Sequence, residues 1–251
     1  MQAGVPIRGS LKSPPLSHSD PIHLHPTAAL AERVLLPGDP GRALALAQAL
    51  LVAPQMFNHH RGLWGYTGAA PDGQPLTIQS TGMGGPSAAI VLSELIALGA
   101  RRAIRVGSCG ALAGDIALGE LVVAREAICA DGTSRALGAG ERASADPGLV
   151  EQLTRAAPAA RVGTVVSVDL FYESDRRPEA EPAEVSHEAL AVEMEAATLF
   201  ALGANAGIAI ACVLVVSDTF DAGGSRARID EETLLDAAKA MGSAAITALS
   251  G

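Results

Sequence analysis

Two glycine-rich segments of this chain combine residue types that bind small oxyanions. Residues 80–87 read Ser-Thr-Gly-Met-Gly-Gly-Pro-Ser, and residues 105–110 read Arg-Val-Gly-Ser-Cys-Gly, each after a strand-like apolar stretch. Glycine lets backbone N–H groups approach an anion closely, while the Ser108 hydroxyl and the Arg105 guanidinium add donors. Arg105 alone has a second interpretation, a salt bridge to an internal carboxylate. The combination indicates an enzyme that uses a small anion.

The segment Leu35–Arg42, Leu-Leu-Pro-Gly-Asp-Pro-Gly-Arg, offers a further anion site. Its glycines, a helix start expected at Pro40 and the charge of Arg42 are the features of a phosphate cradle. The same residues also fit an ordinary strand-turn-helix corner with Asp39 as the helix cap. The segment by itself leaves both interpretations open.

Two carboxylates stand close together in the segment 191–196, Ala-Val-Glu-Met-Glu-Ala. In an extended conformation Glu193 and Glu195 project to the same side, where they repel unless a group with donors lies between them. A sugar diol is one such group. The alternative is a solvated helix start with favourable acidic charges in its first turn.

An acid and a flat aromatic surface complete the set. Ser217 and Asp218 follow a strand-like apolar run, where an aspartate with a raised pKa serves as a general acid, although a turn cap is the alternative. Phe171 belongs to the segment Asp169–Tyr172 of a chain with only 3% aromatic residues. It is a candidate to stack on a flat base, with core packing as the alternative.

These residues need a scaffold that brings distant segments together. Periodicity predicts strands alternating with helices, and therefore βαβ units in an α/β domain. Strands are expected over 33–36, 75–80, 103–106, 120–124, 162–168 and 208–216, and helices over 41–51, 86–98, 195–202 and 230–249. Open α/β sheets bind ligands beyond the carboxyl ends of their strands, where all the motifs above are expected to fall.

Composition bounds the class of protein. The 251 residues, 49% hydrophobic, favour one large domain over 21–251. A net charge of −9 argues against nucleic-acid binding, and no apolar run reaches the roughly 20 residues of a membrane span. The three cysteines lack CxxC spacing, so a reducing cytoplasm fits best. Residues 1–20 are expected to be a disordered leader, and Asp131–Pro147 an exposed excursion.

Six motifs, in this order, resemble nucleoside phosphorylase family I, whose members include bacterial hexameric purine nucleoside phosphorylase and uridine phosphorylase. They are Leu-Pro-Gly-Asp-Pro-Gly-Arg at 36–42, His-Arg-Gly-Leu-Trp-Gly-Tyr-Thr-Gly at 60–68, Thr-Gly-Met-Gly-Gly-Pro-Ser at 81–87, Arg-Val-Gly-Ser-Cys-Gly at 105–110, Val-Glu-Met-Glu-Ala at 192–196 and Ser-Asp at 217–218. The resemblance implies a single α/β domain, a central mixed β-sheet flanked by helices in the phosphorylase/hydrolase-like fold. It also implies a homohexamer, a trimer of dimers with sites shared between subunits.

The resemblance implies phosphorolysis in purine salvage: inorganic phosphate, a co-substrate, attacks C1′ of a nucleoside and releases the base and (deoxy)ribose 1-phosphate. Phosphate would be held by Gly38, Arg42, Arg105 and Ser108, with Arg61 from a neighbouring subunit. The nucleoside would be held by His23 of a neighbour and by Met83, Phe171, Val192, Glu193, Met194, Glu195, Ser217 and Asp218. Asp218 would protonate purine N7, and neither a metal nor a redox cofactor is required.

The chain departs from the family pattern in two places. Purine enzymes carry an arginine beyond the Ser-Asp pair that assists the aspartate, and here Arg226 and Arg228 are both candidates. Uridine enzymes read uracil with a Gln and an Arg after the Phe-Tyr pair, but residues 173–177 contain Arg177 without the Gln. Because uridine enzymes tend to lack the counterpart of Asp218, a purine substrate is favoured and uridine phosphorolysis is the alternative.

More remote functions also remain. The run from Gly82 to Ser87 loosely resembles the dinucleotide-binding fingerprint of oxidoreductases, but Arg101 and Arg102 stand where an acidic ribose ligand is expected. A non-catalytic nucleoside sensor on the same fold would bind nucleoside without releasing base. A nucleoside hydrolase is disfavoured, because water needs no oxyanion cradle.

Overall fold

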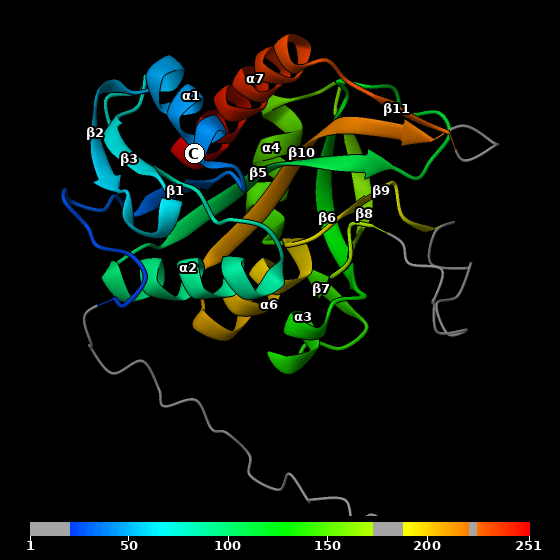
Figure 1. Ribbon diagram of the computed structural model, residues 1–251, viewed down its shortest axis with the longest axis horizontal. Helices are drawn as coiled ribbons and strands as arrows, with labels where there is room; N and C mark the ends of the chain where they lie inside the picture. The colour runs from blue at the N-terminus through cyan, green and yellow to red at the C-terminus, as the bar shows by residue number, and fades with distance from the viewer. Residues whose placement is uncertain (1–20, 173–187, 221–224) are drawn as a thin grey trace, which may run out of the picture.

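The computed structural model describes residues 21–172, 188–220 and 225–251 of the chain (Figure 1). Two sequence-based expectations fall outside these residues: the disordered leader over 1–20 and the departure from the uridine pattern at 173–177. Every motif that carries the family resemblance lies within the described part of the chain.

A mixed sheet of eleven strands runs through the described residues. The strands are β1 (Arg33–Leu36), β2 (Val52–Asn58), β3 (Gly65–Ala69), β4 (Pro75–Gln79), β5 (Arg102–Ala111), β6 (Leu121–Cys129), β7 (Arg142–Ser144), β8 (Arg161–Ser167), β9 (Ala191–Glu193), β10 (Ala209–Phe220) and β11 (Arg226–Arg228). Five of these strands close into a ring, because each pairs with the next in the order β5, β10, β6, β8, β9, and β9 also pairs with β5. Strands β1 and β4 run parallel to β5 and β10 beside this ring, which brings four carboxyl ends to one edge.

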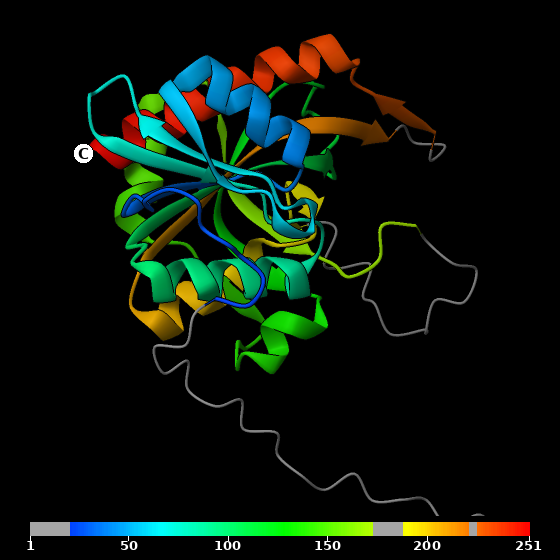
Figure 2. The same ribbon diagram turned by 60° about the vertical axis from the view of Figure 1, so that its left-hand side comes forward.

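Helices cover both sides of the sheet. They are α1 (Pro40–Leu50), α2 (Gly85–Leu98), α3 (Gly132–Ala136), α4 (Pro147–Ala156), α6 (Ala196–Ala206) and α7 (Glu231–Ser250). Figure 1 shows α1 and α7 above the sheet and α2, α3 and α6 below it, and the turned view in Figure 2 shows the same two layers. In the described residues no helix is both long and apolar enough to cross a membrane.

Helix ends follow from local chemistry. The carboxylates of Asp39, Asp146 and Asp230 each accept the N–H three residues on, which caps α1, α4 and α7. Gly99 has a φ of 116° and ends α2 in the left-handed region, where a side chain would be strained. The Asp39 cap places the first turn of α1 shortly after β1, while α2 follows β4 through a glycine-rich turn without a side-chain cap.

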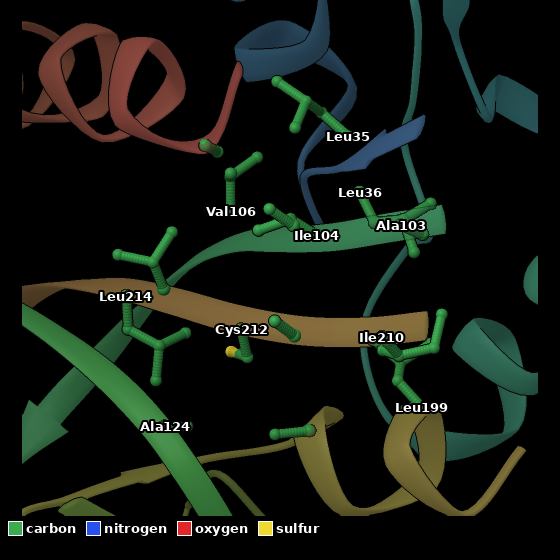
Figure 3. Close-up of a cluster of buried hydrophobic side chains, with 14 of the residues drawn as sticks. Leu35, Leu36, Ala103, Ile104, Val106, Ala124, Leu199, Ile210, Cys212 and Leu214 are labelled. Atoms are coloured by element: carbon green, nitrogen blue, oxygen red, sulfur yellow. The ribbon is translucent and has the colours of Figure 1, made fainter. Parts of the chain in front are cut away.

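The core lies where β5 and β10 pair in parallel (Figure 3). Ile104 of β5 and Cys212 and Leu214 of β10 are fully buried, and Leu199 of α6 covers the same cluster. An apolar strand of this kind is buried on both faces, as the run 208–216 predicts. A tightly packed pair of central strands fixes the residues at their ends.

All ten elements expected from periodicity are present, with ends shifted by a few residues. One expectation is incomplete. The segment Asp131–Pro147 is largely exposed, as expected, but it is not irregular, because it contains α3, contributes β7 to the sheet and opens α4 at Pro147. Asp131, at the start of the segment, is fully buried, and its carboxylate accepts hydrogen bonds from the Ser134 N–H and the Thr198 hydroxyl.

Candidate active site

One cavity of about 2510 Å³ opens at the edge where β1, β4, β5 and β10 end. The predicted site residues that line it are Gly38, Arg42, Met83, Arg105, Ser108, Phe171, Val192, Glu193, Met194, Glu195, Ser217, Asp218, Arg226 and Arg228. The anion hypothesis requires Arg42, Arg105, Ser108 and Glu195 to meet in one cavity. They do so.

Arg105 lies between two buried carboxylates. Its Nε is 3.0 Å from Oε2 of Glu193, and its Nη2 contacts Oε2 of Glu195. Burial opposes a charged guanidinium, but Glu195 and Glu193 outweigh that effect and raise the pKa of Arg105, so it stays charged. The internal salt bridge that sequence left open is therefore present, and the donor between the two carboxylates is a guanidinium. A solvated helix start is excluded, because Glu193 and Glu195 are 4% and 5% exposed.

One nitrogen of Arg105 remains without a partner. Nη1 is buried and makes no hydrogen bond to the described residues. It lies beside the turn after β1, since a Cβ added at Gly38 would be 3.9 Å from it. Gly107 lies against the same guanidinium, where a Cβ would be 2.8 Å from Cζ. A buried donor without an acceptor is costly, and a bound oxyanion would supply the acceptor.

Arg42 brings a second positive charge to this place. The Asp39 carboxylate accepts the Arg42 N–H at 2.6 Å, so the ordinary helix corner and the candidate cradle are one structure. Burial lowers the pKa of Arg42, the charge of Asp39 acts against this, and the neighbouring charge of Arg105 lowers the pKa further. Two cations that repel each other at a helix start favour an anion between them.

The glycine-rich turn after β4 is fastened to the same cluster. Gly82 and Gly84 have φ values of 73° and 83°, which side chains rarely permit. The Gly82 N–H donates to the carbonyl of Gly38 at 3.0 Å, and the Gly84 N–H donates to Oε1 of Glu195 at 2.5 Å. Glu195 is thus held by Arg105 on one oxygen and by this turn on the other.

A third carboxylate lies on β10 after a bulge between Val216 and Asp218. Oδ2 of Asp218 accepts the Ser217 hydroxyl at 2.6 Å, and Oδ1 accepts Nε of Arg226 at 2.7 Å. Arg228 faces Asp218 in the backbone register of β10 and β11, and its charge acts on the carboxylate less strongly than that of Arg226. Burial raises the pKa of Asp218, but the hydrogen bonds from Arg226 and Ser217 outweigh burial and hold the pKa below its usual value. Asp218 is therefore an ionised, paired carboxylate inside a strand, not a turn cap, and the raised pKa expected of a general acid is not found here.

Phe171 lies at the cavity and not in the core, because it is 53% exposed. The Arg226 guanidinium lies over its ring, with Cζ 4.9 Å from the centroid, and Tyr172 meets the ring edge-on. Arg226 therefore links the carboxylate of Asp218 to an aromatic surface of the kind that stacks on bases.

His23 and Arg61 do not line the cavity of their own chain. The segments that carry them meet, because Nδ1 of His60 is 3.1 Å from the His23 carbonyl oxygen and Arg61 follows in the 3₁₀ turn His60–Gly62. Arg61 adopts a φ of 57°, unusual for a residue with a side chain. These two predicted site residues thus belong to adjoining segments outside the cavity lining.

Sequence reasoning did not select Glu94 or Ser167. Glu94 is a buried carboxylate on α2 that accepts Nδ1 of His23 at 2.7 Å and the backbone N–H groups of Ile22, His23 and Leu24. The sequence signal was one acidic residue in an otherwise apolar helix. The Ser167 hydroxyl, at the end of β8, donates to Oε1 of Glu193. Its type and position carry no signal that separates it from other serines.

The fold and the site define an enzyme of the phosphorylase class. The family model described as the phosphorylase superfamily matches residues 32–250, and the chain belongs to this superfamily.

Relatives within the superfamily are similar over most of the chain. It is 38% identical over 203 residues to the DeoD-type purine nucleoside phosphorylase of Alkaliphilus metalliredigens, covering 78% of this chain and 85% of that protein. It is 40% identical over 198 residues to the DeoD-type purine nucleoside phosphorylase of Jannaschia sp., covering 75% and 82%. A crystal structure of Toxoplasma gondii purine nucleoside phosphorylase in complex with immucillin-H superposes with a TM-score of 0.77 at 26% identity, covering 87% and 90%.

Proposed function

We propose that this protein catalyses the phosphorolysis of purine (deoxy)ribonucleosides by inorganic phosphate. One observation carries the proposal: the unpartnered Nη1 of Arg105 and the cation of Arg42 lie in one cavity with Glu195. The DeoD-type relatives are named for purine nucleosides, which supports purine over uridine. The products are the free base and (deoxy)ribose 1-phosphate.

In this proposal, phosphate binds to Arg42, Arg105, Ser108 and the backbone at Gly38. These groups hold a phosphate oxygen toward C1′ of the sugar, which is held by Glu195 and Met194. As the bond between C1′ and the base nitrogen breaks, positive charge develops on the sugar ring. The phosphate dianion stabilises that charge and then forms the new C1′–O bond.

The base leaves more easily when N7 is protonated, because the departing group is then neutral. We assign the proton to Asp218. Its carboxylate is ionised in the free protein, so it takes up a proton from solvent when the nucleoside binds, passes that proton to N7 and becomes a carboxylate again. Of the two candidate arginines we assign the assisting role to Arg226, because its Nε contact stabilises the carboxylate that proton transfer produces. Phe171 stacks on the base, while Met83, Val192 and Ser217 border it.

The proposal includes an oligomer with shared sites, a homohexamer in the cytoplasm that serves purine salvage without a metal or redox cofactor. Its support is the separation of His23 and Arg61 from the cavity of their own chain. Each subunit would donate His23 to the 5′-hydroxyl and Arg61 to the phosphate in a neighbour. Light scattering after size exclusion checks the assembly, and mixing Arg61→Ala with Asp218→Asn subunits should restore activity if sites are shared.

A panel of inosine, guanosine, adenosine, their 2′-deoxy forms and uridine, each with and without phosphate, tests the reaction by following base release. We expect release from purine nucleosides only when phosphate is present. Release without phosphate would make the protein a hydrolase, and release from uridine alone would overturn the purine assignment. Binding of inosine without release would identify a sensor, and stabilisation by a nicotinamide dinucleotide but not by phosphate would indicate an oxidoreductase.

A further inference from the structure

The carboxylate of Glu193 is enclosed, although the residue borders the cavity. Its side chain has 0% exposed surface, so only its backbone reaches the cavity. Oε2 accepts the N–H groups of Glu195 and Ala196 and Nε of Arg105 at 2.9–3.0 Å. Oε1 accepts the Ala196 N–H at 2.9 Å and the Ser167 hydroxyl. Since a carboxylate has only about four acceptor positions, none remains for a sugar or a base.

The contact with Glu193 determines how Arg105 is oriented. A guanidinium usually binds one carboxylate with two parallel hydrogen bonds, but here Glu193 takes Nε and Glu195 takes Nη2. This division turns the third nitrogen, Nη1, toward Gly38 and leaves it unpartnered. Without the bond to Nε, the planar guanidinium would be free to rotate into a paired arrangement with Glu195. That rotation would move Nη1 away from the turn.

We propose that Glu193 is a positioning residue for phosphate binding and not a ligand of the nucleoside. It holds Arg105 across two carboxylates so that Nη1 faces the turn at Gly38, where a phosphate oxygen binds. The inference rests on the proposed phosphorolysis and adds to it: phosphate affinity depends on a carboxylate that touches neither substrate.

Three variants test this. Glu193→Gln keeps the size of the side chain and an acceptor oxygen, but it removes the negative charge that holds Arg105. Glu193→Asp keeps the charge but withdraws the carboxylate by one methylene from Nε of Arg105 and from the helix N–H groups, and it is informative if the Gln variant does not fold. Ser167→Ala is the matched control, because it removes one neutral partner of Glu193 and leaves the Arg105 contact intact.

The measurements are KM for phosphate, KM for inosine, kcat, and the dissociation constant of inorganic phosphate by calorimetry without nucleoside. We expect Glu193→Gln and Glu193→Asp to raise KM and Kd for phosphate at least about tenfold, while KM for inosine changes less than about twofold. Ser167→Ala should lower thermal stability and change the phosphate constants less than about twofold.

Two results would overturn the inference. A rise in KM for inosine with unchanged phosphate binding would make Glu193 a nucleoside ligand. Equal losses for both substrates in both Glu193 variants would reduce its role to stability of the fold. If the parent protein bound no phosphate, the proposed function itself would fail, and the parent calorimetry alone reports that outcome.

Discussion

Nε of Arg226 lies 2.7 Å from Oδ1 of Asp218, and the same guanidinium covers the ring of Phe171. A short strand, β11, thereby ties a carboxylate on β10 to the aromatic surface that follows β8. Movement of one of these groups must disturb the other. The acid and the base-stacking ring are therefore expected to respond together to substitution at Arg226.

Replacing Asp218 with Asn should lower kcat for inosine by about 10²–10⁴, because the amide cannot give a proton to N7. KM for phosphate should stay close to that of the parent, since Arg42 and Arg105 are untouched. Steady-state kinetics with each substrate varied separately checks both statements. Turnover equal to that of the parent would remove Asp218 from the mechanism.

Arg226→Met and Arg228→Met form a matched pair on β11. Arg226→Met should lower kcat for inosine by about tenfold or more, because the carboxylate of Asp218 loses its charged partner. Arg228→Met should have a smaller effect, since the charge of Arg228 acts on Asp218 without a hydrogen bond among the described residues and more weakly than that of Arg226. The reverse order would assign the assisting role to Arg228.

Arg42→Ala and Arg105→Ala should separate binding from stability. Arg42→Ala should raise KM for phosphate by about tenfold with little change in Tm, since its guanidinium lines the cavity without a carboxylate partner among the described residues. Arg105→Ala should also impair phosphate use, and in addition lower the free energy of unfolding by about 3–5 kcal/mol, because Glu193 and Glu195 lose their buried counter-ion. Phosphate titrations and urea unfolding of both variants check this. Unchanged phosphate titrations would refute the role.

Phe171→Ala should raise KM for purine nucleosides by about five- to a hundredfold, the range expected when one aromatic–base stack is lost. The control is Tyr172→Ala, which removes the edge contact with Phe171 but not a residue that lines the cavity. Initial rates with inosine decide the question. Equal effects of the two substitutions would show that Phe171 contributes only through local packing.

Asp72 gives a pH-dependent prediction about stability. Hydrogen bonds from Arg33 and then from Ser250 hold the pKa of this carboxyl well below its usual range. The pKa of Asp72 is lower in the folded protein than the value of about 3.9 in the unfolded chain, so its ionised carboxylate stabilises the fold at pH values above about 3.9. This stabilisation is lost as the pH falls through the pKa of the folded protein. Asp72→Asn should therefore cost about 1 kcal/mol at pH 7, a difference that shrinks only below about pH 4.

Urea unfolding of the parent and of Asp72→Asn at a series of pH values measures this difference. The matched control is Asp236→Asn, which breaks an exposed pair with Lys239 on α7 and should change the free energy of unfolding less. A cost of Asp72→Asn that is the same from pH 7 to pH 3 would contradict the assignment.

The fold and the phosphate cluster could be predicted because their signals are local. The apolar run 208–216 indicates a buried strand by itself, and the glycine-rich turns at 36–42 and 81–87 fall directly after strands. The choice between Arg226 and Arg228 could not be made from sequence. It depends on the register of the three-residue strand β11 against β10, which no periodicity encodes.

Contacts between residues far apart in the sequence could not be predicted either. Glu94 is paired with residues about seventy positions earlier in the chain, so its neighbours along α2 say nothing of its partners. The burial of Asp131 could not be predicted for a related reason. Its polar character predicts exposure, but Thr198 of a distant helix completes its hydrogen bonding inside the protein.

The hydrogen bonds between Glu94 and residues 22–24 set a limit for truncation and tagging of this protein. Trimming or fusing the chain ahead of Pro21 spares the backbone donors and the imidazole that this carboxylate uses. Removal of residues up to and including Leu24 deletes all of these donors and leaves the Glu94 carboxylate unpaired on an apolar helix. The loss of stability would therefore extend beyond the deleted residues.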